Sequence, residues 1–162
     1  MNFDFPLFFR FRDIRVTASI CLEFAKNPST FIKNYWWRIH QKELKTAPIE
    51  WGKKHENTAF EVCLEMFKDV KKCGFFVSKK FPQFGCSPDG IIPNEWLIEI
   101  KCPFLLKDTT PTDLSKLSAA QKRSFFLVET PYGVQLDKKH KYHYQCQWQM
   151  FVTGLKKLKF IV

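Results

Sequence analysis

The sequence has no uninterrupted apolar run near 18 residues, the length that a membrane-spanning helix requires. The apolar stretch over residues 1–11 is interrupted by Asp4 and Arg10, and no small-residue cleavage site follows it. Internal repeats and low-complexity tracts are also absent. We therefore expect neither a membrane protein, nor a secreted precursor, nor a repeat array.

Paired cysteine motifs are missing as well. None of the six cysteines forms a C-x-x-C pair, so a zinc or iron–sulphur site is not expected. Most of them lie in apolar patterns, which is typical of buried thiols. We expect an intracellular protein in a reducing compartment, the cytoplasm or nucleus. The six are Cys21, Cys63, Cys73, Cys86, Cys102 and Cys146.

Acidic residues are few relative to basic ones. The 162 residues include 26 Lys and Arg against 16 Asp and Glu, a net charge of +10, which favours a nucleic-acid partner over a membrane. No motif for reading bases is present, so we expect sequence-independent contact with the phosphate backbone. With 45% hydrophobic residues, the chain predicts one domain over residues 1–162, with an N-terminal arm over residues 1–15. The basic pairs are Lys53-Lys54, Lys71-Lys72, Lys79-Lys80, Lys138-Lys139 and Lys156-Lys157.

The stretch over residues 85–103 carries the clearest candidate chemistry. Its Ser-Pro-Asp-Gly segment, residues 87–90, predicts a turn, and residues 96–101 predict a strand. Because side chains alternate along a strand, Glu99 and Lys101 share one face, together with Leu97. The residues expected to face the core are Trp96, Ile98 and Ile100.

Two charged side chains at the end of an apolar strand are costly to bury without partners. Asp89 can reach Glu99 across the predicted hairpin, a layout that suits a divalent cation held by oxygen ligands. The alternative is an edge-strand salt bridge from Lys101 to either carboxylate, and the hairpin alone does not decide between them.

The remaining segments alternate between helix and strand. The longest periodic segment, residues 49–72, predicts an amphipathic helix on which Gly52 and Glu56 share a face, although a solvated glutamate is the ordinary alternative. The helix expected over residues 138–152 carries Gln145 and Gln149 on an unusually polar stripe.

Further helices are expected over residues 31–44 and 114–122, and strands over residues 75–81, 91–92, 125–130, 134–136 and 158–162. This order predicts an α/β (α+β) fold, a central mixed sheet with a three-stranded antiparallel meander flanked by helices.

A candidate phosphate site precedes the first helix, expected over residues 19–26. Arg12 and Arg15 lie just before it, and Thr17 or Ser19 can cap it. Arginines beside a helix N-terminus can bind phosphate. An ordinary cap in a solvated basic segment is an equally good interpretation of these residues alone.

Four ordered motifs together resemble a known family. They are Gly-x-x-x-Glu (residues 52–56), Ser-Pro-Asp-Gly (87–90), Glu-Ile-Lys-Cys-Pro (99–103) and Tyr-x-Tyr-Gln-x-Gln (142–147). In this order they resemble the PD-(D/E)XK nuclease superfamily, with its restriction-endonuclease-like core, and more narrowly the YqaJ-like viral recombinase group, to which phage lambda exonuclease is similar. The resemblance runs from about Arg12 to the C-terminus. Relatives continue beyond the strand expected near residue 158, so we expect a C-terminus shortened relative to the family.

The resemblance implies a metal site. Asp89 and Glu99 would bind Mg²⁺, for which Mn²⁺ can substitute, and the backbone carbonyl of Ile100 would be a third ligand. Glu56 would act through water or a second metal. Such a set agrees with the needs of phosphodiester hydrolysis, which uses a metal ion, a water nucleophile and cationic help in the transition state.

The resemblance also implies roles for the other motif residues. Lys101 would orient or activate the attacking water and offset charge on the phosphate. Gln145 would position Lys101, the water or the substrate phosphate. Arg12, with Arg15 as the alternative, and Ser19 would bind the 5′-phosphate of a DNA end.

The function that follows is Mg²⁺-dependent hydrolysis of DNA, as a 5′→3′ exonuclease on linear double-stranded DNA with 5′-phosphate ends, used in recombination. The resemblance further implies a single-strand annealing protein as partner and, by analogy with lambda exonuclease, a homotrimer. A structure-dependent endonuclease on the same fold is one alternative. A non-catalytic nucleic-acid-binding module is the other, although the intact Asp89, Glu99 and Lys101 argue against it.

Overall fold

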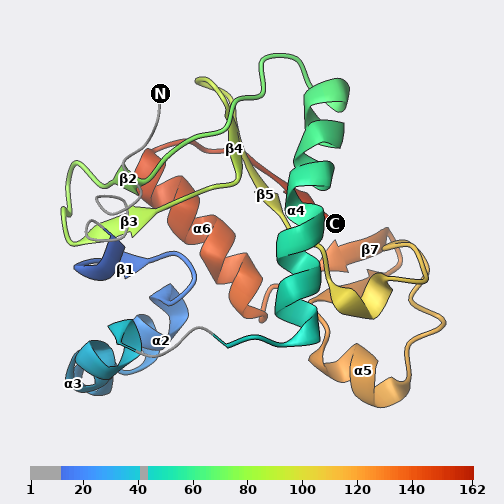
Figure 1. Cartoon of the computed structure of the whole chain (residues 1–162), viewed down its shortest axis with the longest axis horizontal. Helices are drawn as coiled ribbons and strands as arrows, with labels where there is room; N and C mark the ends of the chain where they lie inside the picture. Colours follow the sequence, from blue (N-terminus) through green and yellow to red (C-terminus); the bar gives the residue numbers. More distant parts are fainter. Residues whose placement is uncertain (1–11, 41–43) are drawn as a thin grey trace.

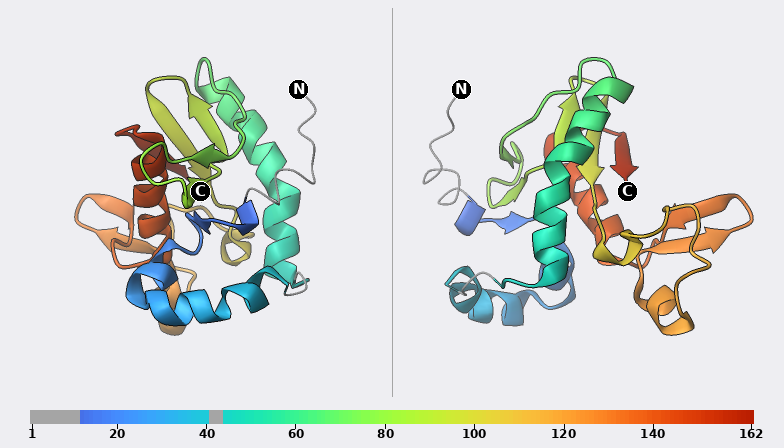
Figure 2. Two further views of the ribbon diagram at one scale, coloured as in Figure 1. Left: turned by 90° about the vertical axis from the view of Figure 1, so that its left-hand side faces the viewer. Right: turned by 45° about the vertical axis from the view of Figure 1, so that its right-hand side comes forward.

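The computed structural model describes residues 12–40 and 44–162 (Figure 1). Most of the expected N-terminal arm, residues 1–11, lies outside the described residues. The helices pack around two small mixed sheets, and a separate two-stranded hairpin projects from one end (Figures 1 and 2). The helices are α2 (Cys21–Lys26), α3 (Pro28–Ile39), α4 (Ala47–Met66), the 3₁₀ turn η1 (Phe104–Leu106), α5 (Ala119–Ser124) and α6 (Lys141–Thr153).

Both three-stranded sheets combine parallel and antiparallel pairing, whereas the separate hairpin is antiparallel. In the first, β3 pairs parallel to β1 and antiparallel to β2. In the second, β5 pairs antiparallel to β4 and parallel to β8. The strands are β1 (Val16–Thr17), β2 (Phe76–Val77), β3 (Phe84–Cys86), β4 (Gly90–Ile92), β5 (Trp96–Ile100), β6 (Leu127–Thr130), β7 (Gly133–Leu136) and β8 (Leu158–Ile161).

The α/β class with mixed sheets flanked by helices is confirmed, but the expected three-stranded meander is divided. The segment expected over residues 75–81 contributes β2, which pairs with β3 rather than with the β4–β5 hairpin. The third strand of the second sheet is β8, which returns from the C-terminal end of the chain. A long crossover of this kind is what a parallel pair requires.

Strand β5 is the centre of the second sheet and is buried on both faces. Ile98 and Ile100 pack against Phe60 and Cys63 of α4, while the opposite face lies under α6 (Figure 2). The predicted alternation of faces is therefore correct. The expectation that Leu97 lies away from the core is wrong, because α6 covers that side and leaves Leu97 0% exposed. The alternative of an edge-strand salt bridge is correct only in part: Lys101 and Glu99 do form a salt bridge, but β5 is not an edge strand, since it has a neighbour on each side.

Several helix boundaries differ from the sequence prediction. The helix expected over residues 49–72 ends at Met66, because Val70 is buried against Ile98 and Lys71 pairs with Ile91 at the edge of β4. This is a case of tertiary pairing overriding a helical pattern. The helix expected over residues 114–122 begins only at Ala119, where Ser118 and Gln121 form a capping box.

The start of α2 also corrects a prediction. Its N-cap is Ile20, without a side-chain cap, and the hydroxyls of Thr17 and Ser19 contact each other at 3.3 Å instead. The helix expected over residues 31–44 starts earlier, at Pro28, whose missing N–H costs nothing in a first turn.

The C-terminal elements agree closely with expectation. Helix α6 ends at Gly154, which adopts the left-handed conformation with φ 79° that glycine accepts readily. The hairpin β6–β7 and strand β8 form where expected.

All six cysteines are free thiols, and four are buried, as the apolar patterns predicted. Burial raises the pKa of Cys21 to about 11 and those of Cys73 and Cys146 to about 12, so these thiols stay protonated. Across the described residues, no helix combines the length and apolarity needed to cross a bilayer.

The double-sided burial of β5 makes a stability prediction. Ile98→Ala removes a side chain that is fully buried between sheet and α4, so we expect the free energy of unfolding to fall by about 2–5 kcal/mol. Urea denaturation followed by circular dichroism measures this loss. Ile32→Ala, at an exposed position on α3, is the control and should change stability by less than about 0.5 kcal/mol. Equal, small losses in both variants would contradict the assigned core.

Candidate active site

Asp89 is tied to the end of β5 by two hydrogen bonds to the backbone of that strand. Asp89 lies in the bend before β4, where its N–H donates to the carbonyl of Ile98 at 3.0 Å. Its Oδ2 in turn accepts a hydrogen bond from the N–H of Ile100 at 2.6 Å. The turn expected over residues 87–90 is not formed, because Asp89 occupies a bend and Gly90 already begins β4. The Asp89 carboxylate nevertheless lies beside the residue pair Glu99 and Lys101.

Glu99 is the most buried charged side chain in the described chain, at 1% exposure. Its Oε1 accepts hydrogen bonds from Lys101 Nζ and from Gln145 Nε2. Its Oε2 accepts from Gln149 Nε2 at 2.6 Å. One cation and two amides therefore surround a carboxylate that would be very costly to bury alone.

Lys101 is held on three sides. Besides Glu99, its Nζ donates to the carbonyl of Ile100 at 3.2 Å and lies 5.1 Å from the centre of the Tyr142 ring. Burial lowers the pKa of Lys101, but the charge of Glu99, its hydrogen bond and the charge of Asp89 outweigh burial and raise the pKa overall. Lys101 is therefore cationic at neutral pH, as expected for a lysine between two carboxylates.

The pKa of Asp89 is shifted so that its charged form is disfavoured, unlike that of Lys101. Burial, and next the negative charge of Glu99, raise the pKa of Asp89 to about 7, although the Ile100 N–H and Lys101 lower it. Glu56 adds a smaller like-charge effect. Three carboxylates thus converge on one region with one half-buried lysine among them, and burial first, then the charge of Glu99, disfavours the ionised form of Asp89.

A polar cavity of about 240 Å³ opens beside these carboxylates. Segments far apart in the sequence meet there: the β1–α2 region, α4, the bend before β4, and α6. Its lining residues are Arg12, Thr17, Ala18, Ser19, Glu56, Phe75, Ser87, Asp89, Gln145 and Gln149.

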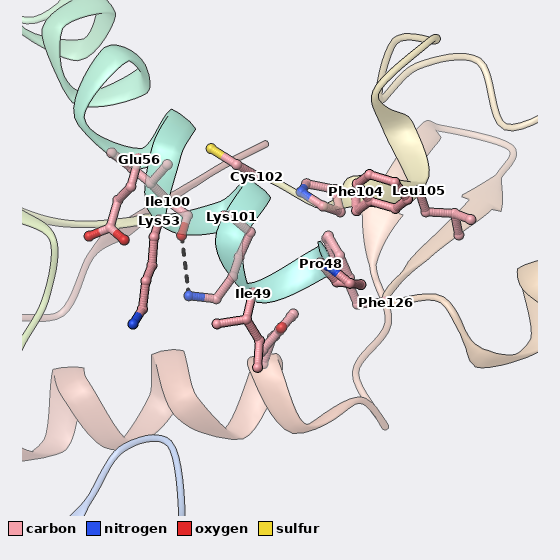
Figure 3. A pocket seen from close by; sticks show the side chains of 13 residues that line it. Pro48, Ile49, Lys53, Glu56, Ile100, Lys101, Cys102, Phe104, Leu105 and Phe126 are labelled. Atoms are coloured by element: carbon pink, nitrogen blue, oxygen red, sulfur yellow. Dashed lines mark hydrogen bonds between the residues drawn. The ribbon is translucent and has the colours of Figure 1, made fainter. Parts of the chain in front are cut away.

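A larger, mainly apolar cavity of about 580 Å³ lies on the other side of Lys101. In Figure 3 the charged groups of Lys53, Glu56 and Lys101 gather at one side of it, and Phe104 and Phe126 stand at the other. Glu56 lines both cavities. The carboxylates therefore lie between a polar recess and an apolar one.

The structure brings nearly all of the sequence-predicted site residues together. Arg12, Ser19, Glu56, Asp89 and Gln145 line the polar cavity. Ile100 and Lys101 line the apolar cavity, and Glu99 is buried behind them, in contact with Lys101 and Gln145.

Arg15 and Gln149 depart from the sequence-based set. Arg15 is absent from the cavity lining, because its Nε donates to the carbonyl of Pro82 at 2.8 Å. The sequence analysis placed Gln149 only on a polar stripe, yet Gln149 contacts Glu99 directly. Its four-residue spacing from Gln145 puts both amides on one helix face, and this spacing could have predicted the contact.

The residues present fit a hard divalent cation. In residues 12–40 and 44–162, no three His, Cys, Asp or Glu side chains form a ready-made metal cluster. The oxygen donors at hand are the Asp89 and Glu99 carboxylates and the Ile100 carbonyl, a small set of the kind Mg²⁺ takes while keeping several waters. Burial and the charge of Glu99 raise the pKa of Asp89, and a bound divalent cation would oppose both by favouring the ionised carboxylate.

A central buried Glu-x-Lys, an aspartate in the preceding bend and glutamines from a packed helix define a nuclease core of the PD-(D/E)XK type. The chain belongs to the YqaJ-like viral recombinase domain family, whose model matches residues 7–156. A search of curated proteins found no match.

Solved structures agree with this family. A crystal structure of an alkaline exonuclease, LHK-Exo from Laribacter hongkongensis, is similar with a TM-score of 0.65 and 24% sequence identity. The similarity covers 96% of this chain and 72% of that one. The structure of LHK-Exo in complex with dAMP is similar to the same extent. At this identity the likeness establishes the fold, and family and fold together are those of deoxyribonucleases.

The crowding at Asp89 predicts a pH-dependent stability in the absence of divalent cations. The folded-state pKa of Asp89 is raised, to about 7, above its ordinary value of 3.8, so the folded protein holds this proton more tightly than the unfolded chain. As pH rises from about 4 to about 7, the unfolded chain ionises first and stability falls. We expect Asp89→Asn, which keeps an oxygen for the Ile100 N–H, to be more stable than wild type at pH 8, by an amount on the order of a few kcal/mol.

Thermal unfolding in EDTA between pH 4 and pH 8 measures this effect. The stability advantage of Asp89→Asn should shrink towards zero at the acidic end. Asp108→Asn, on an exposed loop, is the matched control and should follow the wild-type curve. A pH-independent difference between Asp89→Asn and wild type would contradict the raised pKa.

Proposed function

We propose that the chain is a Mg²⁺-dependent deoxyribonuclease that acts as a 5′→3′ exonuclease on linear double-stranded DNA with 5′-phosphate ends. The observation that carries the proposal is the meeting of Arg12, Ser19, Glu56, Asp89 and Gln145 in one polar cavity next to Glu99 and Lys101. The family resemblance predicted these five residues from motifs far apart in the sequence, and their meeting in one recess supports the roles that it implies.

Asp89, Glu99 and the Ile100 carbonyl would hold the metal ion, with Mn²⁺ able to replace Mg²⁺. When bound, such an ion polarises a phosphoryl oxygen and makes bound water more acidic. Glu56 faces the same cavity from α4 and can accept a proton or hold a water there. The carboxylates also repel an approaching phosphodiester, so the metal ion would be needed before DNA can enter.

Lys101 provides the fixed positive charge of the site. Its ammonium group is anchored by Glu99 and by the Ile100 carbonyl, so it needs little reorganisation to face negative charge that develops on the phosphate. Gln145 donates to the same Glu99 oxygen and keeps this carboxylate in place. Both residues therefore support chemistry at the metal-binding carboxylates.

Arg12 and Ser19 support the choice of a 5′-phosphate end. Both are exposed residues that line the polar cavity, where an anion could be held by a guanidinium and a hydroxyl. A terminal phosphate held there would place the first phosphodiester of that strand near Asp89. Cleavage from this end proceeds in the 5′→3′ direction.

The remaining parts of the proposal concern partners. The net charge of +10 suits a duplex backbone bound without sequence preference. A role in recombination, a single-strand annealing protein as partner and a homotrimer are proposed on family grounds alone, as is an intracellular location.

Digestion of end-labelled DNA tests the proposed chemistry. We expect wild-type protein with Mg²⁺ to degrade linear duplex DNA and to leave closed circular DNA intact. Asp89→Ala and Lys101→Ala should lower the rate by at least about a thousandfold, since each removes a group that acts in the chemical step. Circular dichroism of both variants is the control, and we expect it to show that they fold. Cutting of circular DNA by wild type would instead favour an endonuclease, and DNA binding without cleavage would favour a non-catalytic module.

The 5′-phosphate site makes a separate prediction. Arg12→Ala should reduce the preference for 5′-phosphate over 5′-hydroxyl ends about tenfold or more, because it removes a charge-assisted contact to the terminal phosphate. Paired time courses on the two substrates give the preference directly. Arg123→Ala, on α5 and away from the polar cavity, is the control. An unchanged preference in Arg12→Ala would remove Arg12 from the end-binding site.

A further inference from the structure

Gln149 is the one site-lining glutamine that is fully buried. It lies on α6 one turn after Gln145 and is 1% exposed. Its Nε2 donates to Glu99 Oε2 at 2.6 Å, while Gln145 and Lys101 take the other oxygen. Each oxygen of the Glu99 carboxylate therefore has its own amide donor, both from the same helix face.

The amide oxygen of Gln149 has no such partner. Among the described residues, Oε1 of Gln149 is the buried side-chain polar atom left without a hydrogen bond. An unsatisfied buried acceptor destabilises the folded chain, because it has given up its water without gaining another donor. The amide cannot turn round to relieve this cost, because its oxygen would then face the Glu99 carboxylate.

The amide oxygen of Gln149 lies where it could accept a hydrogen bond from a molecule in the polar cavity. Gln149 lines the polar cavity together with Asp89, Glu56 and Ser19. A buried acceptor beside a polar cavity can be satisfied by a small hydrogen-bond donor held there, and water is the donor that hydrolysis itself requires. The orphaned oxygen is thus explained if the cavity holds an ordered water during the reaction.

We propose that Gln149 is a positioning residue for the metal site. Its Nε2 keeps Glu99 Oε2 from turning towards Lys101, and its Oε1 accepts a hydrogen bond from a water in the polar cavity. This inference rests on the proposed function, since it assigns Gln149 to the same metal-binding carboxylate. It concerns a residue absent from the sequence-based set, and it separates the roles of the two amides on α6.

The physical reason is competition for Glu99. Without Gln149, Oε2 would lose its only described hydrogen-bond donor, and Lys101 could engage both carboxylate oxygens. A Glu99 side chain committed to Lys101 is a weaker metal ligand. Partners that orient a metal-binding side chain typically contribute 10–100-fold in metal affinity or activity.

The test compares Gln149→Met with Gln135→Met. Methionine matches glutamine in length and removes both the N–H donor and the oxygen acceptor, and Gln135 is an exposed position on β7 that lines neither cavity. Mg²⁺ is titrated into each protein without DNA, and the rise in Tm gives the half-saturating concentration. Steady-state digestion of linear duplex DNA gives kcat and KM. Gln149→Asn, one methylene shorter, serves as a second variant if Gln149→Met does not fold.

We expect the half-saturating Mg²⁺ concentration to rise about tenfold in Gln149→Met and kcat to fall about 10–100-fold with little change in KM, while Gln135→Met matches wild type. A purely structural role would lower Tm and leave the Mg²⁺ response of the folded protein unchanged, which would overturn the inference. A wild-type protein with neither Mg²⁺ response nor cleavage would overturn the proposed function itself.

Discussion

The site is organised around one carboxylate, Glu99, buried at the centre of a sheet. Burial of such a group costs several kcal/mol unless every lone pair is engaged, and here one lysine and two amides engage it. Because the donors come from β5 and α6, the carboxylate also ties the helix to the sheet. The position of α6, and with it one wall of the polar cavity, therefore depends on the same contacts that prepare the site.

Local chemistry in the sequence was enough to predict the floor of the site. Ser-Pro-Asp-Gly marks the change of direction that brings Asp89 to the end of β5, although it forms a bend rather than the expected turn, and the strand period decides that Glu99 and Lys101 share a face. The resemblance then added Glu56, Gln145, Arg12 and Ser19, all of which line the polar cavity or contact Glu99. Each of these residues lies within a short sequence motif, so each could be predicted without knowing the tertiary structure.

Tertiary features were harder to predict from sequence. The rotation of α6 against the sheet decides that Gln149 reaches Glu99, and no periodicity measures that rotation. The end of α4 at Met66 depends on a pairing between Lys71 and Ile91, and the side chain of Arg15 is directed by the carbonyl of Pro82. Each of these contacts joins residues distant in the sequence, so short-range patterns carry little information about them.

The balance of charge links folding and function at this site. Asp89, Glu99 and Glu56 lie near one half-buried lysine, Lys101, and burial together with the charge of Glu99 raises the pKa of Asp89. A phosphodiester would add further negative charge to the same place. Under the proposed function, a divalent cation would offset this charge before DNA enters, and relief of the repulsion among the carboxylates would contribute to metal affinity.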